Sequence, residues 1–109
     1  MNLVIQQGKL TDNPQMRYSV ENMAIARFRI AVPKKIVKTG GPTADFFDCT
    51  AFGKSAENIN KFFRMGDTIL VKGRLENDNY TTREGNKVYG NVIIVEEWEF
   101  GPKKRVDQQ

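Results

Sequence analysis

Residues 44–77 read ADFFDCTAFGKSAENINKFFRMGDTILVKGRLEN, and this stretch decides the fold. Residues 46–52 combine three phenylalanines with short side chains, which predicts a strand. Residues 68–77 predict another strand, because apolar residues alternate there with Lys72 and Arg74. A helical segment lies between the two strands.

Residues 54–63 predict this short helix, with Ser55 as its cap. Its apolar face consists of Ala56, Ile59, Phe62 and Phe63, which recur at spacings near three and four. Gly66 and Asp67 end the segment, so a turn leads directly into the next strand.

The flanking sequence predicts three more strands. Residues 1–10 are apolar and end in a turn at 11–14. Residues 23–32 alternate, with Ala24, Ala26, Phe28, Ile30 and Val32 on one face and Ile25, Arg27, Arg29 and Ala31 on the other. Residues 80–88 predict a hairpin around residues 84–86 that leads into a last strand at 88–100. In that last strand Val92, Ile94, Trp98 and Phe100 form the expected apolar face.

The predicted order is therefore β-β-β-α-β-β. This is the order of the five-stranded OB-fold barrel, an all-β fold with one short helix whose open face and loops bind oligonucleotides. We expect one domain over residues 1–100, followed by a short basic tail at 101–109 that is disordered.

Composition limits the function classes. The net charge of +4 and the pI near 9.3 favour a polyanionic partner, although a soluble domain with a few extra lysines is the equal alternative. The chain has no histidine, a single cysteine and no phosphate-binding loop, which disfavours an enzyme, a metal site and a cofactor. Cys49 lies in an apolar strand and predicts a buried structural thiol. No apolar run is long enough to span a membrane and no secretory leader begins the chain, so we expect a cytoplasmic protein.

Binding a single strand of nucleic acid requires aromatic faces for the bases and cations for the phosphates. Phe46, Phe52 and Tyr80 are the candidate stacking residues. The candidate phosphate-binding residues are Lys34, Lys35 and Lys38 in a basic loop, with Lys54, Lys72, Arg74 and Arg83 elsewhere. Core packing is the alternative role for each aromatic residue, and a solvated surface is the alternative role for the lysines.

Three motifs in order resemble the bacterial and phage single-stranded DNA-binding (SSB) proteins. The first motif is Met1-Asn2-x-Val4-Ile5, followed by Gly8, Leu10, Thr11, Pro14, Arg17 and Tyr18. The second covers residues 44–58 and includes Phe52-Gly53-Lys54-x-Ala56-Glu57-Asn58. The third is Gly66-Asp67, followed by Val71-x-Gly73-Arg74-Leu75 and Tyr80. The resemblance covers about residues 1–100. It implies OB domains that form homotetramers, wrap single-stranded DNA, and take part in DNA replication, recombination or repair.

The resemblance also implies roles for individual residues. Phe46, Phe52 and Tyr80 match stacking positions of the family, and Lys54 and Arg74 match polar or basic positions near the DNA. Three places depart from the family pattern: Ile36 replaces a loop aromatic, residues 76–79 read Glu-Asn-Asp-Asn where relatives carry basic residues, and Phe47 replaces a polar residue near the subunit contact.

Cellular members of the family recruit repair proteins through an acidic tail, which this sequence does not contain, so we expect no recruitment of that kind. The sequence is then either a truncated form or a short phage or mobile-element form. Two other functions stay open. One is a dimeric OB-fold replication-restart accessory protein. The other is a protein-interaction module that uses Phe47, Trp98 and the last strand.

Overall fold

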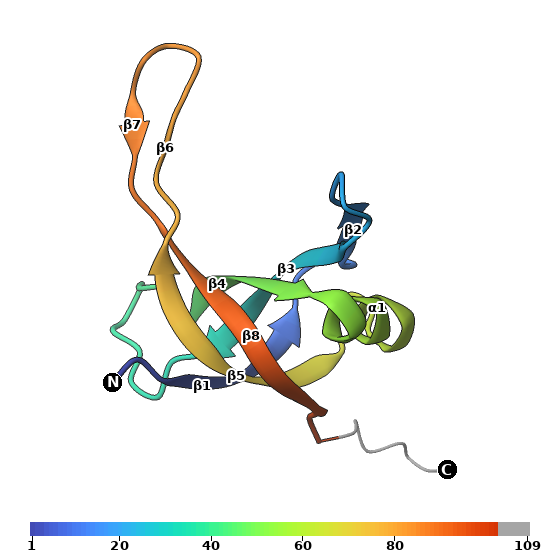
Figure 1. Ribbon diagram of the computed structural model, residues 1–109. Coiled ribbons are helices and arrows are strands. Elements are labelled where there is room, and N and C mark those ends of the chain that lie inside the picture. The colour runs from blue at the N-terminus through green and yellow to red at the C-terminus, as the bar shows by residue number, and fades with distance from the viewer. Residues whose placement is uncertain (103–109) are drawn as a thin grey trace.

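Five long strands form the barrel that the sequence predicts (Figure 1). They are β1 (Val4–Leu10), β3 (Ala24–Pro33), β4 (Ala44–Phe52), β5 (Thr68–Asn77) and β8 (Asn91–Phe100). The sheet runs β1-β5-β8-β4-β3, and pairing between β3 and β1 closes it. The β4–β8 pair is parallel, whereas the other pairs are antiparallel. The expected OB-type barrel is therefore confirmed.

The computed structural model describes residues 1–102. Most of the predicted basic tail, residues 103–109, lies outside the described residues.

One helix, α1 (Gly53–Phe62), lies between β4 and β5 at one end of the barrel (Figure 1). The expected Ser55 cap is wrong: the helix begins at Gly53, whose φ of 63° turns the chain out of β4, and the extended Phe52 precedes it without a side-chain cap. Ala56 and Ile59 are buried, and Phe63 follows the helix into the core. Phe62, expected on the same face, is instead about half exposed, at 47%.

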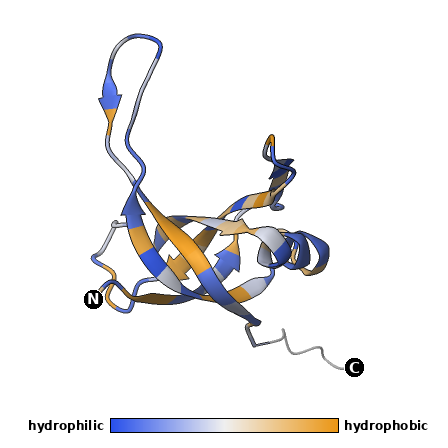
Figure 2. Ribbon diagram, in the orientation of Figure 1, coloured by the Kyte–Doolittle hydropathy of each residue, from blue (hydrophilic) through white to orange (hydrophobic). Residues whose placement is uncertain are grey.

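The core forms because the strands alternate in and out with period two. On β3 the predicted inner face is buried from Ala24 to Ile30, and Arg27 and Arg29 face outward. Figure 2 shows that apolar residues concentrate on the barrel strands, whereas the β6–β7 hairpin is mostly polar. Burial raises the pKa of the Cys49 thiol to about 12, with a smaller effect from the Asp48 charge, so this cysteine is the expected structural thiol.

Three short strands extend the predicted pattern. β2 (Gln15–Tyr18) pairs with the start of β3 and was not predicted, because its residues are mostly exposed and carry no apolar alternation. β6 (Tyr80–Thr81) and β7 (Lys87–Val88) form the predicted hairpin as a separate two-stranded ribbon that projects from the barrel (Figure 1). The last barrel strand therefore starts at Asn91 rather than at residue 88.

A β-bulge divides the last strand. Gly73 pairs with Val95 and Lys72 pairs with Glu97, so Glu96 is the extra residue in β8. An extra residue reverses which side chains face inward. The expected single apolar face is therefore wrong: Ile93 and Val95 are buried in the core, whereas Val92 and Ile94 line a groove on the outer face. Beyond the bulge, Trp98 packs against the core with its ring centroid 5.5 Å from that of Phe63.

Gly73 permits the close approach of β5 and β8 at this bulge. A Cβ atom at this position would overlap the backbone carbonyl of Ile94. We predict that Gly73→Ala lowers the free energy of unfolding by about 1–3 kcal/mol, the usual cost of overpacking. Chemical denaturation would measure the change.

Gly90→Ala is the matched control, because a Cβ there meets only Asp78 O at 3.4 Å and the backbone φ is not positive. Equal effects of the two substitutions would show that the close approach at Gly73 contributes nothing.

Candidate nucleic-acid interface

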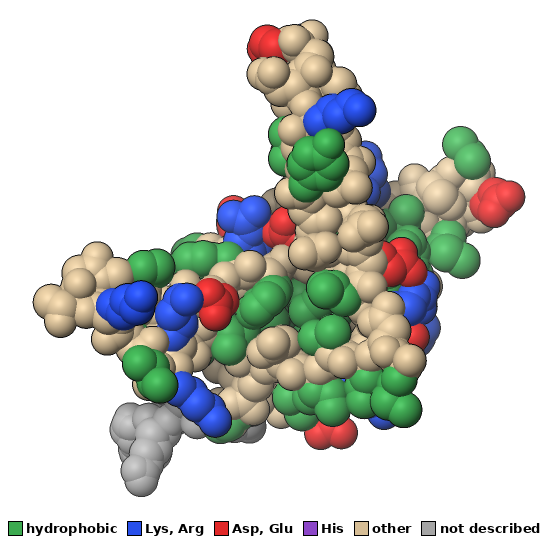
Figure 3. Space-filling model, turned by 90° about the vertical axis from the view of Figure 1, so that its left-hand side faces the viewer, with side chains coloured by type: hydrophobic (Ala, Val, Ile, Leu, Met, Phe, Trp, Pro, Cys, Tyr) green, Lys and Arg blue, Asp and Glu red, His purple; other side chains and the backbone are tan. Residues whose placement is uncertain are grey.

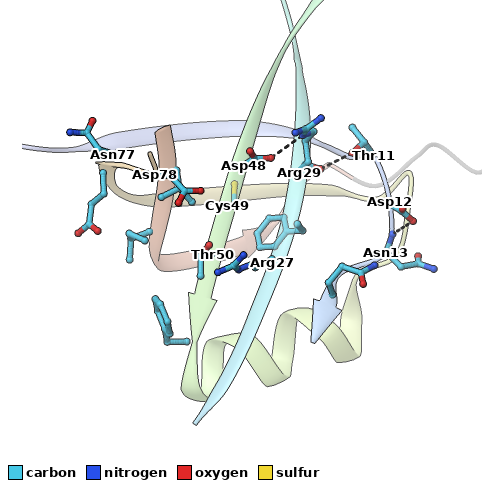
Figure 4. A pocket seen from close by; sticks show the side chains of 16 residues that line it. Thr11, Asp12, Asn13, Arg27, Arg29, Asp48, Cys49, Thr50, Asn77 and Asp78 are labelled. Carbon is cyan, nitrogen blue, oxygen red and sulfur yellow. Dashed lines mark hydrogen bonds and ion pairs between the residues drawn. The ribbon is translucent and has the colours of Figure 1, made fainter. Parts of the chain in front are cut away.

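A groove of about 510 Å³ crosses the outer face of β3, β4 and β8 (Figure 4). One end of the groove is formed by Thr11, Asp12, Asn13 and Gln15, and the other by the end of β5 with Asp78. Figure 4 shows that Arg27, Arg29, Asp48 and Thr50 come from the two central strands.

Strand register sets the order of side chains along this groove. Across β3 and β4, Arg27 pairs with Thr50 and Arg29 pairs with Asp48. Across β4 and β8, Asp48 pairs with Val92 and Thr50 with Ile94. The groove therefore has a charged side along β3 and an apolar side along β8.

The three predicted stacking residues are all exposed at the surface. Phe46, Phe52 and Tyr80 expose 59%, 42% and 58% of their surface, so the core-packing alternative is wrong for each of them. Phe46 and Phe52 share the outer face of β4, six residues or roughly 20 Å apart. Tyr80 lies on the projecting hairpin, opposite Val88.

Phe47 points the other way and packs partly buried against the core, as adjacent strand residues must. Ile36, the residue expected to replace a loop aromatic, is 85% exposed in the loop after β3. Figure 3 shows hydrophobic side chains gathered below the hairpin, with Lys and Arg side chains around them.

The predicted phosphate-binding residues fall into two groups. Three form ion pairs: Lys34 with Asp45 at 3.1 Å, Lys72 with Glu97 at 3.9 Å, and Arg74 with Glu76 and Glu96 at 2.6 and 3.0 Å. The Glu76 hydrogen bond, followed by that of Glu96, raises the pKa of Arg74. The other four, Lys35, Lys38, Lys54 and Arg83, are exposed and form no ion pair within residues 1–102.

Arg27 and Arg29 were not predicted as site residues, although both were expected on the outer face of their strand. The structure puts both in the groove. Arg29 Nε donates a hydrogen bond of 2.9 Å to Asp48 Oδ1, which raises the pKa of Arg29. Period-two alternation in the sequence indicates that both arginines face outward, but only the β3–β4 register shows that Arg29 faces a carboxylate. Tyr18 and Tyr89 are two further exposed aromatic residues.

Residues 1–102 contain no cluster of three or more side chains suited to hold a metal ion. Within the same residues, no helix has the length and apolar character needed to cross a membrane.

Fold and site together define an OB-type barrel whose open face carries exposed aromatic and cationic side chains. The chain matches the Single-strand binding protein family over residues 1–101, and it belongs to that family.

Known proteins similar to this chain carry the same description. A single-stranded DNA-binding protein from Fusobacterium nucleatum is 41% identical over 107 residues, which are 95% of this chain and 69% of that protein. One from Bacillus cereus is 36% identical over 92% of this chain and 59% of its own length. A crystal structure of a deletion mutant of the Thermus aquaticus single-stranded DNA binding protein superposes with a TM-score of 0.78 at 26% identity. All of this chain corresponds to 45% of that longer Thermus chain.

Proposed function

We propose that this chain binds single-stranded DNA without sequence specificity, in support of DNA replication, recombination or repair. Bases stack on Phe46, Phe52 and Tyr80. The phosphates are contacted by the seven predicted cations, Lys34, Lys35, Lys38, Lys54, Lys72, Arg74 and Arg83. The observation that carries this proposal is the exposure of all three aromatic side chains on one strand face and its adjacent hairpin. Membership of the family adds independent support.

Aromatic stacking suits binding without sequence preference, because every base has a π-face. It also selects unpaired strands, since bases in a duplex already stack on one another. Four cations, Lys35, Lys38, Lys54 and Arg83, form no ion pair among the described residues 1–102; they lie in the loop after β3, in the first turn of α1 and on the hairpin. We assign the main phosphate contacts to these four, and weaker contacts to the paired Lys34, Lys72 and Arg74.

Anisotropy of a dye-labelled oligothymidine of about 35 nucleotides tests the proposal, a length that spans several OB sites. We expect tight binding that weakens as salt rises, because phosphate contacts release counterions. Excess duplex DNA does not displace the oligonucleotide. Absence of binding at low salt would refute single-strand binding and favour the protein-interaction alternative.

Phe46→Ala and Tyr80→Ala test the stacking assignment. Each is expected to weaken binding by about 1–3 kcal/mol, the general range for alanine substitution of a base-stacking residue in single-strand binding proteins. The same titration measures the loss.

Phe62→Ala is the matched control, because Phe62 is also an exposed phenylalanine but lies at the end of α1, on neither the outer face of β4 nor the hairpin. If Phe62→Ala weakened binding as much as Phe46→Ala, stacking would not be specific to the proposed positions.

We also propose that the chain assembles with copies of itself, as a homotetramer. Between Val4 and Gly8, β1 pairs only with β5, so its other edge faces no strand within the described residues. An unpaired edge is a template for another chain, and Leu3 and Ile5 add exposed apolar surface beside it.

Sedimentation equilibrium gives the assembly state directly. We expect the mass of four 12.4 kDa chains. The mass of two chains would instead favour the dimeric replication-restart alternative, and a monomer would contradict assembly through β1.

A further inference from the structure

The middle of the groove is occupied by an ion pair between its own residues. Asp48 lies on the outer face of β4 between Phe46 and Phe52, two and four residues from them. Its Oδ1 accepts the hydrogen bond from Arg29 Nε at 2.9 Å, and both side chains stay about half exposed, at 50% and 57%. A single DNA strand that stacks on both phenylalanines would therefore pass over this pair, whose contact Figure 4 marks with a dashed line.

The backbone holds Arg29 in this position. Its carbonyl oxygen accepts hydrogen bonds from Thr11 N at 2.9 Å and Thr11 Oγ1 at 3.4 Å. Its Cα lies opposite that of Asp48 in the β3–β4 register. The contact between the guanidinium and the carboxylate is therefore built into the pairing of two central barrel strands.

The groove is lined by more acidic than basic side chains. Besides Asp48, its lining includes Asp12, Glu76 and Asp78, whereas its cations are Arg27 and Arg29. Glu76 is itself held by Arg74. Although the chain carries a net charge of +4, the groove lining is acidic.

We infer that Asp48 occupies the place on Arg29 that a DNA phosphate would otherwise take, and thereby limits the affinity for single-stranded DNA and its dependence on salt. This inference rests on the proposed function. Asp48 is thus an affinity-setting residue, whereas the aromatic residues supply the binding.

The chemistry of the two anions supports this assignment. Carboxylates and phosphates present oxygen pairs that match the donors of a guanidinium. A neutralised Arg29 gains little from a phosphate, because the phosphate must first displace Asp48. An Arg29 paired with Asp48 also adds nothing to counterion release, because that release scales with the number of phosphates that protein cations neutralise.

Asp48→Asn tests the inference, because it removes the negative charge and keeps the size of the side chain. In the oligothymidine titration we expect roughly two- to fivefold tighter binding at low salt, the range of one exposed ion pair. The slope of log affinity against log salt steepens by about 0.7, the value for one more phosphate on a single strand.

Two control variants separate the release of Arg29 from a general change of charge. Glu99→Gln makes the same charge change on β8, at an exposed residue outside the groove. We expect it to leave the slope of log affinity against log salt unchanged. Arg29→Gln also leaves the slope unchanged, because Arg29 does not contact phosphate while Asp48 holds it. The double variant Arg29→Gln with Asp48→Asn likewise keeps the slope of the unmodified chain.

Folding of each variant is checked by thermal melting, and Asp48→Ser serves as a second variant with the same charge change. An unchanged or weaker affinity of folded Asp48→Asn would overturn the inference while the unmodified chain still binds DNA. A shallower slope for Arg29→Gln would also overturn it, because Arg29 would then already contact a phosphate. Failure of the unmodified chain to bind would instead refute the proposed function, and the inference with it.

Discussion

The contact between β5 and β8 at Gly73 is the constraint on which both faces of the barrel depend. Because the two backbones meet there without a side chain between them, β8 accommodates one extra residue, Glu96. Before the bulge, β8 gives Ile93 and Val95 to the core and Val92 and Ile94 to the groove. After the bulge, Trp98 again faces the core. One strand thereby supports the interior and lines the open face.

The candidate interface combines exposed aromatic side chains with cations, and about half of these cations are paired with acidic residues of the protein. Three of the seven predicted phosphate-binding residues and Arg29 face carboxylates of the same chain. Exposed ion pairs of this kind add little to stability. Their main consequence is electrostatic: the cations that stay unpaired within residues 1–102 lie in the loop after β3, on α1 and on the hairpin, whereas the groove itself is acidic.

The sequence predicted those features that depend on local periodicity. Alternation identified β3 and its outward arginines, and the adjacent Phe46 and Phe47 had to face opposite sides of β4. Features that depend on pairing between distant segments were not predicted. The bulge at Glu96 reversed the expected face of β8, and the Arg29–Asp48 pair arises from the β3–β4 register. Likewise β2 forms only because β3 offers it an edge, and its own residues carry no apolar pattern.

The hairpin gives Tyr80, one of the three proposed stacking residues, a support separate from the barrel. In the part of the chain that the structure describes, β6 and β7 pair only with each other, and the backbone hydrogen bond from Asp78 N to Gly90 O marks where their ribbon leaves the barrel. The spacing between Phe46 and Phe52 is fixed by a single strand, whereas the reach from either of them to Tyr80 depends on the angle of this arm. If bases stack on all three rings as proposed, the number of nucleotides that one chain covers depends on the angle of this arm as well as on the barrel.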